Sequence, residues 1–289
     1  MRFGVHPVSF NQGSDHGSIP ATLAETARTA EDLGFDWFVL SDHWFQMEMV
    51  GAVDDPMPEG YTSLGFVAAA TRTIQLGLLV TGVTYRHPGL LAKTVATLDA
   101  LSGGRALLGI GAGWYEREHR GLGVPFPPLG ERFDRLEEAL RICRQMWSAN
   151  TGSFDGTHFQ LAETICAPGP VRDDGIPIVV GGGGERRTLR LVAEHGDACN
   201  LIASGVDEVR HKLAVLDRHC ADVGRDPSTV LRTVMVPFDV FDRATPFAEE
   251  LSAYQDLGIG LTIFVPYGDP VGYLHRCNDT FLSDWLGTR

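Results

Sequence analysis

The feature that most constrains this chain is an alternation of short apolar runs with longer amphipathic runs, which continues along the whole sequence. Such alternation is typical of repeated strand–helix units that form a parallel sheet. Several short runs are almost continuously apolar, as strands covered on both faces should be. Eight runs are predicted to be strands: Phe3–Val8, Trp37–Leu40, Ile74–Val80, Ala106–Ile110, Ile178–Val180, Ala198–Ile202, Leu231–Val236 and Leu261–Val265.

The longer runs place apolar residues three or four positions apart, which predicts helices with one face against the sheet. Eight strand–helix units within 289 residues favour a closed barrel, the (β/α)8 or TIM barrel, over an open doubly wound sheet. We therefore expect one domain over residues 1–289. In the segment 148–176, an Asp155-Gly156 turn between aromatic residues predicts a short hairpin insertion between strands four and five.

Charge and composition exclude several classes of protein. The net charge of -13 disfavours nucleic-acid binding, which needs a basic face. No run approaches the length of a membrane span, and the N-terminal residues do not read as a signal peptide. The five cysteines are widely spaced and suggest neither a metal site nor a disulfide framework. We expect a cytoplasmic protein that acts on a small molecule.

Barrel enzymes place their sites at the carboxyl ends of the strands, so the residues directly after each strand are the candidates. Asp42 and His43 follow the second strand. A carboxylate there can bind a cofactor or substrate, and a neutral imidazole can exchange a proton near physiological pH. The alternative is a turn with local side-chain capping, and the residues themselves leave both interpretations open.

Glycines dominate two further loops. Gly181–Gly184 follows the fifth strand, and we expect it to lead directly into a helix, where backbone N–H groups favour an anion such as phosphate; a merely flexible turn is the alternative. Gly111, Ala112 and Gly113 follow the fourth strand and permit backbone contact with a planar ligand, or form an ordinary barrel loop. Glu116, nearby, is either catalytic or simply exposed.

The segments Leu79–Pro88, Ser102–Arg105 and Gly109–Trp114, with Ser41–His43 and Gly130–Phe133, resemble the luciferase-like flavin and deazaflavin oxidoreductases. The resemblance covers most of the chain and favours the coenzyme F420-dependent branch. It implies hydride transfer between a deazaflavin and a small organic substrate. A monooxygenase that uses FMN is the nearest alternative, and a non-catalytic barrel that only binds the cofactor is an alternative of another class.

The resemblance also implies roles for individual residues. His43 would donate or accept a proton, and the cofactor phosphate would lie near the loop glycines. A non-prolyl cis peptide between Gly82 and Val83 would back the middle ring. The residues expected to bind the cofactor are Asp42, Gly82, Val83, Thr84, Gly111, Ala112, Gly113, Gly182, Gly183 and Gly184.

The sequence departs from the family at Trp114, because sugar-phosphate dehydrogenases of the family carry a glutamate directly after the G-x-G of this loop. Their catalytic acid has no counterpart at Trp114, so a sugar-phosphate substrate is doubtful, and Glu116 is the hypothetical substitute. The last predicted helix, 270–286, is rich in aromatic residues, including Trp285. Packing on the barrel is the commoner explanation, and a homodimer contact is the alternative.

Overall fold

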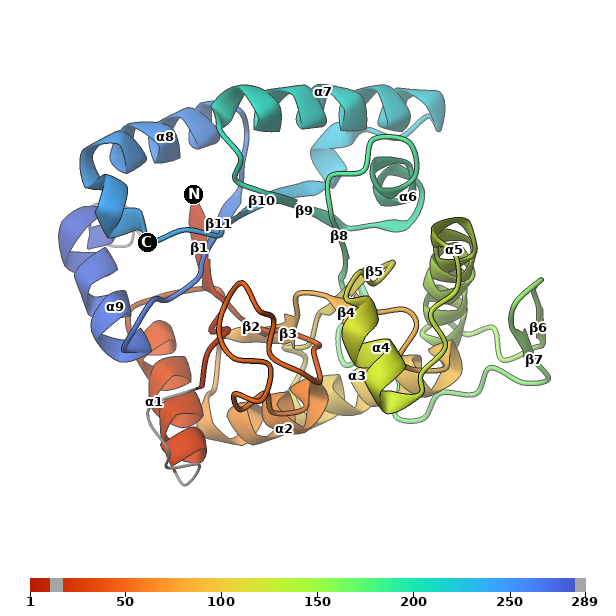
Figure 1. The fold of residues 1–289 in the computed structure, drawn as a ribbon. Helices are drawn as coiled ribbons and strands as arrows, with labels where there is room; N and C mark the ends of the chain where they lie inside the picture. Colours follow the sequence, from red (N-terminus) through yellow and green to blue (C-terminus); the bar gives the residue numbers. More distant parts are fainter. Residues whose placement is uncertain (11–17, 284–289) are drawn as a thin grey trace.

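The computed structural model of the chain describes residues 1–10 and 18–283. Nine of its strands form one parallel sheet in the order β3-β2-β1-β11-β10-β9-β8-β5-β4, and helices surround this sheet on its outer side (Figure 1). The strands are β1 (Arg2–Val5), β2 (Trp37–Leu40), β3 (Gln75–Leu78), β4 (Thr81–Gly82), β5 (Leu108–Gly111), β8 (Ile178–Gly181), β9 (Ala198–Ile202), β10 (Leu231–Val236) and β11 (Leu261–Phe264).

The two edges of the sheet meet and close the barrel. Leu76 of β3 forms a parallel bridge with Ala106, just before β5. Its N–H donates to Arg105 O and its carbonyl accepts from Leu107 N, both at 2.9 Å. The third predicted strand, Ile74–Val80, contains β3, and β4 follows it directly; together β3 and β4 fill one position of the barrel. The sheet therefore occupies eight positions around the cylinder, and the predicted (β/α)8 fold is confirmed.

Helices of 7 to 18 residues surround the barrel. They are α1 (Ile19–Asp32), α2 (Gly60–Ala70), α3 (Pro88–Ser102), α4 (Glu116–Leu122), α5 (Leu129–Met146), α6 (Thr188–His195), α7 (Val206–Asp222), α8 (Ala244–Asp256) and α9 (Pro270–Cys277). Helix α5 shows the expected spacing of three or four positions: its apolar residues between Phe133 and Trp147 face the core, and Leu136, Leu140 and Cys143 are completely buried. None of the described helices is both long and apolar enough to cross a bilayer.

Strand bounds follow the predictions closely, and the differences have physical causes. The strands at 37–40, 198–202 and 231–236 begin and end where predicted. The first strand ends at Val5 instead of Val8, since Pro7 has no N–H to continue the ladder. The third predicted strand is interrupted after Leu78: Leu79 N–H still donates to Leu40 O at 2.8 Å, whereas Thr81 pairs with β5.

The predicted insertion is an antiparallel hairpin of β6 (Phe154–Asp155) and β7 (Gln160–Leu161), which projects beside α5 (Figure 1). The predicted last helix changes character after α9 and continues as a π-helical turn, Asn278–Leu282. Tyr273 and Phe281 pack against Phe241, with ring centroids 5.3 and 5.5 Å apart. This part of the helix therefore packs on its own barrel, while Trp285 lies outside the described residues.

Candidate active site

A cavity of about 510 Å³ opens at the carboxyl ends of the strands, where a barrel enzyme is expected to bind its ligands. It brings together the loops after β2, β4, β5 and β8, which are far apart in the sequence. The residues predicted as site residues that line it are Asp42, His43, Gly82, Gly111, Ala112, Gly113, Gly182 and Gly184.

Four predicted site residues do not line this cavity. Val83 is buried in the core, and Thr84 Oγ1 lies 2.6 Å from His119 Nε2. Gly183 lines an adjoining hollow of about 130 Å³, which it shares with Lys212. Glu116 lies on the outer face of α4, about half exposed, with Arg120 NH2 2.8 Å from its carboxylate.

The non-prolyl cis peptide expected between Gly82 and Val83 is found between Leu79 and Val80 instead. The expected position was wrong because Gly82 and Val83 take part in sheet pairing. Gly82 is in register with Gly111, and Val83 N–H donates to Gly111 O at 3.0 Å, an arrangement of extended trans backbone. The cis peptide thus lies three residues before the predicted position, in the short segment between β3 and β4.

Val80 and two glycines form one wall of the cavity. A Cβ atom on Gly111 would lie 2.9 Å from Val80 Cγ2, and one on Gly181 would lie 2.7 Å from Val80 Cγ1. Both contacts are closer than real Cβ atoms make, so the valine side chain occupies space that only glycine leaves free. The cavity wall between β5 and β8 is therefore made of backbone and a single apolar side chain.

The loop after β8 does not lead directly into a helix as expected, because Glu185, Arg186 and Arg187 lie between its glycines and α6. The approach is nevertheless helix-like, since Leu189 N–H donates to Gly184 O at 3.0 Å. Among the described residues, no hydrogen bond occupies the N–H groups of Gly183 and Gly184. These donors, ahead of a helix N-terminus, can receive an anionic group.

Asp42 is held by a bidentate ion pair at the floor of the site. Its two carboxylate oxygens accept from Arg86 at 2.7 and 2.9 Å, and Oδ2 also accepts from Gly82 N–H at 3.1 Å. Arg86 bonds Glu59 as well, at 2.6 Å. Burial alone would lower the pKa of Arg86, but its bonds to Asp42 raise it, so the guanidinium stays charged. Asp42 therefore contributes a neutralised, rigid edge to the cavity.

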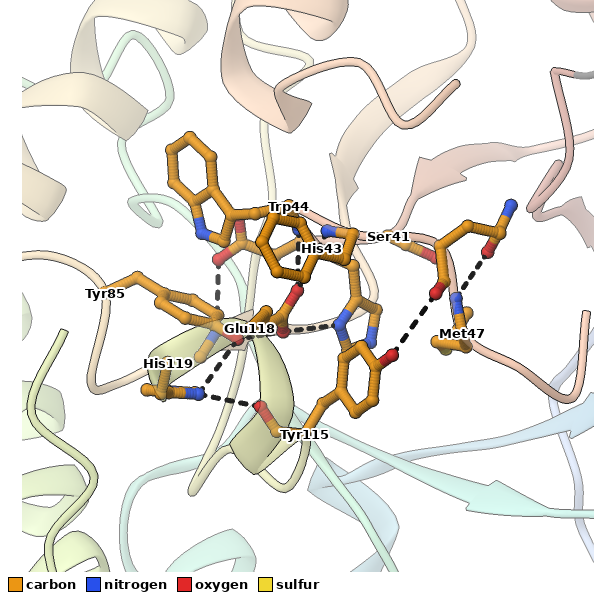
Figure 2. Close-up of polar contacts among 12 residues, drawn as sticks. Ser41, His43, Trp44, Met47, Tyr85, Tyr115, Glu118 and His119 are labelled. Atoms are coloured by element: carbon orange, nitrogen blue, oxygen red, sulfur yellow. Dashed lines mark hydrogen bonds and ion pairs between the residues drawn. The ribbon is translucent and has the colours of Figure 1, made fainter. Parts of the chain in front are cut away.

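His43 is held by an acid that the sequence analysis did not single out. Its Nδ1 atom lies 2.8 Å from Oε1 of Glu118, which comes from α4 and is completely buried, and Figure 2 shows the two groups facing each other. The imidazole ring meets the edges of Trp114 and Tyr115 at centroid distances of 5.4 and 5.7 Å. The other ring nitrogen, Nε2, remains for a ligand.

Glu118 collects four donors around one carboxylate (Figure 2). Oε1 accepts from His43 and from the hydroxyl of Tyr85, while Oε2 accepts from the N–H groups of Trp44, at 2.7 Å, and Phe45, at 3.3 Å. Burial alone would raise the pKa of Glu118, but these hydrogen bonds lower it, so the acid is ionised at neutral pH. The buried charge ties the loop after β2 to α4.

Tyr85 and His119 pack together beside Glu118. The two rings stack with centroids 4.5 Å apart, and His119 Nδ1 lies 2.8 Å from Tyr115 O. Burial and the neighbouring carboxylate raise the pKa of Tyr85, so its hydroxyl keeps its proton and donates to Glu118.

A second imidazole lies close to the site but cannot act in the same way. His6 Nε2 is 3.0 Å from Ser41 Oγ, and burial lowers the pKa of His6 to about 3. It stays neutral at physiological pH. Of these two histidines, only His43 lines the cavity. Among the described residues, no group of three or more His, Cys, Asp or Glu is arranged to hold a metal ion.

The sequence carried one signal for the missed acid. On a helix, Glu116 and Glu118 are about 200° apart, so only one of them can face the barrel. Tyr115, Glu118 and His119 are three or four positions apart and share a face, and all three are buried. Because Glu118 and His119 lie on the same helix face as the aromatic Tyr115, the spacing indicates a polar cluster that faces the barrel.

Comparison with known proteins was consistent with this architecture. The luciferase-like monooxygenase family matches residues 1–260 of the chain. An F420-dependent glucose-6-phosphate dehydrogenase from Kineococcus radiotolerans is 39% identical over 166 residues, which are 57% of this chain and 48% of that protein. The chain spans about half the length of the dehydrogenase relatives it matches.

Two further comparisons extend over nearly the whole chain. A protein of unassigned function from Mycobacterium tuberculosis is 30% identical over 264 residues, covering 87% of this chain and 88% of that protein. The solved structure of an F420-dependent secondary alcohol dehydrogenase in complex with an F420-acetone adduct superposes with a TM-score of 0.80. The superposition covers 97% of this chain and 98% of the alcohol dehydrogenase chain. At 19% sequence identity, this similarity shows a shared fold.

Proposed function

Since the chain belongs to the luciferase-like monooxygenase family, we propose that it is a coenzyme F420-dependent oxidoreductase that transfers a hydride between the deazaflavin and a small organic substrate. The observation that carries the proposal is one cavity in which a glycine-walled cleft adjoins the imidazole of His43. The relatives named as F420-dependent enzymes support the choice of cofactor.

The residues present fit such a cofactor. A planar ring can pack against an apolar wall, and Gly111 and Gly181 provide one because they leave room for the side chain of Val80 to lie between β5 and β8. A phosphate needs hydrogen-bond donors that the protein does not already use, and the N–H groups of Gly183 and Gly184 can serve as such donors. The cavity, at about 510 Å³, lies within the usual size of small-molecule sites.

His43 is the residue that would move a proton. Coenzyme F420, when bound, exchanges a hydride with the substrate, so oxidation of an alcohol to a ketone delivers two electrons and the carbon-bound hydrogen to it and releases the hydroxyl proton. Glu118 orients the ring of His43 so that Nε2 can take up that proton. In the reverse direction the same atom returns it to the carbonyl oxygen.

A second candidate function follows from the family description, which is that of a monooxygenase. FMN shares the planar ring and the phosphate, and a backbone-walled cavity accepts either cofactor. Oxygen chemistry separates the two, because the deazaflavin has carbon in place of the flavin nitrogen that supports oxygen activation.

Titration of the purified protein with coenzyme F420 and, separately, with FMN tests the proposal. Trp114 lines the cavity, so its fluorescence should report binding, and a Trp114→Phe variant identifies its share of the signal. We expect tight binding of F420 and weak binding of FMN. The reverse preference, with oxygen consumed during turnover, would establish the monooxygenase alternative, and binding of neither would refute both.

A variant separates an enzyme from a barrel that only binds the cofactor. We expect His43→Ala to bind F420 as the wild type does and to lose hydride transfer, because the ring lies beside the cleft and not among its glycines. A fully active His43→Ala protein would exclude proton transfer by this residue.

A further inference from the structure

We propose that this site acts on an uncharged, largely apolar alcohol or ketone, and that it excludes phosphorylated and carboxylated substrates. The proposal rests on the function proposed above and names its substrate class. It is carried by two observations: the apolar lining of the cavity beside His43, and the engagement of the neighbouring cations with protein carboxylates and carbonyls.

The side chains that line the cavity are mostly apolar. In the part of the chain that the structure describes, its lining includes no lysine and no arginine. The one carboxylate in it, that of Asp42, is already neutralised by Arg86. The apolar side chains of the lining are Leu79, Val80, Trp114, Leu129, Phe133, Ile202 and Met235.

Trp114 and Leu129 expose an unusual amount of apolar surface at the cavity. Their relative exposures are 53% and 55%, although both line the site. Exposed apolar surface of this kind commonly marks a place where a ligand or partner binds. Because Trp114 meets His43 edge-on at 5.4 Å, the apolar wall stands directly beside the group that would exchange the proton.

The cations nearest the cavity wall on the α5 side and at its floor are fully used by the protein. Arg86 is shared between Asp42 and Glu59. Arg132 is buried and donates to the carbonyls of Ala112 and Gly113. Drawing either guanidinium toward a ligand would leave these buried acceptors without a partner, which costs more than an exposed pair returns.

Two of the cations beside the glycine loop, Arg187 and Lys212, are engaged as well, and the third, Arg186, is exposed to solvent and does not line the cavity. Arg187 bonds Asp134 at 2.8 Å, on α5. Lys212 lies 2.7 Å from Glu185 and 3.2 Å from Glu208, in the hollow next to Gly183 and outside the main cavity. An anionic substrate entering beside Trp114 would therefore lose its hydration without gaining a counter-ion.

A matched set of ketones tests the proposal on the F420-loaded protein. We would measure the affinity of 2-pentanone, of 4-oxopentanoate, and of the methyl ester of 4-oxopentanoate, by competition and fluorescence, and then kcat/KM with reduced F420. The acid and the ester differ by one charge at the same position. We expect the two neutral ketones to be preferred over the carboxylate by about tenfold or more, and glucose 6-phosphate to bind no better than the carboxylate.

A pair of variants tests the cause of this preference. Leu129→Lys places an ammonium group at the cavity, whereas Leu122→Lys is the matched control, since Leu122 is 49% exposed on α4 and does not line the cavity. We expect Leu129→Lys to improve the relative affinity for 4-oxopentanoate by about two- to fivefold, and Leu122→Lys to leave the ratio unchanged.

Equal affinities for the neutral and charged ketones would overturn the proposal, and so would a failure of all three ketones to bind. Preferred turnover of glucose 6-phosphate would overturn it as well. Equal effects of the two lysine variants would overturn its stated cause. Failure of F420 to bind in the titration is a different result, because it would refute the proposed function before any substrate is tested.

Discussion

The Nδ1 atom of His43 lies 2.8 Å from Oε1 of Glu118, and the glutamate side chain has no exposed surface. An ionised carboxylate accepts but cannot donate, so the proton of the neutral imidazole must reside on Nδ1. Nε2 is then the acceptor that a substrate hydroxyl would meet. In the proposed reaction Glu118 would thus be a positioning residue, which acts on the substrate only through His43.

Glu118→Gln should lower kcat by about 10- to 100-fold. An amide has a single oxygen, so two of the four donors that the carboxylate now satisfies would face an NH2 group. Nitrogen chemical shifts of His43 in the cofactor-free protein should show that the Nδ1–H tautomer is no longer favoured.

Two variants make this result specific. Glu116→Gln, on the exposed face of the same helix, should leave both kcat and the tautomer unchanged. Glu118→Asp keeps the charge and should recover part of kcat. An unaltered tautomer and kcat in Glu118→Gln would show that the pair has no positioning role.

Arg86→Met should destabilise the protein by about 3–5 kcal/mol, because it leaves the buried carboxylate of Asp42 without its counter-ion. The double variant Arg86→Met with Asp42→Asn should be more stable than the single variant, since no buried charge remains. Urea unfolding with an unchanged m-value measures both differences. If the double variant is no more stable than Arg86→Met, the cost arises from lost packing on Tyr61 and not from the unpaired charge.

The positions of the strands could be predicted from the sequence because buried parallel strands are short apolar runs between helices. The interruption at Leu79–Val80 could not, since nothing in a non-proline sequence marks a cis peptide. Glu116 was singled out over Glu118 because it lies closer to the strand. Which face of the short helix α4 turns inward is fixed by its contacts with the loops after β2 and β4, and those contacts are tertiary information.

His6 should make the protein less stable as the pH falls. Burial lowers the pKa of His6 to about 3, so the unfolded chain binds a proton near pH 6.5 that the folded protein does not. Stability is then unaffected above about pH 7 and is lost between about pH 6.5 and pH 3. Relative to His6→Gln, the wild-type free energy of unfolding should fall by an additional ~1.4 kcal/mol per pH unit below pH 6.

Chemical unfolding between pH 7.5 and 4.5 measures these slopes. His275→Gln, at an exposed position on α9, serves as the matched control for replacing a histidine by a glutamine. Parallel curves for the wild type and His6→Gln would mean that the buried imidazole takes up a proton in the folded state.

Gly181→Ala should both destabilise the barrel and weaken cofactor binding, because its Cβ atom would lie 2.7 Å from Val80 Cγ1. Overpacking of this kind costs about 1–3 kcal/mol. Adding Val80→Ala removes the clashing methyl groups, so the double variant should regain much of the stability. Gly130→Ala is the control, since nothing lies within 4 Å of its Cβ position in α5, and it should stabilise the helix by about 0.5–1 kcal/mol.

Urea unfolding and F420 titration of these variants distinguish two outcomes. If Gly181→Ala weakens F420 binding and the added Val80→Ala restores both binding and stability, Val80 sets the shape of the cleft wall. If Gly181→Ala is as stable as the wild type, the valine can move away, and the wall does not require glycine at this position.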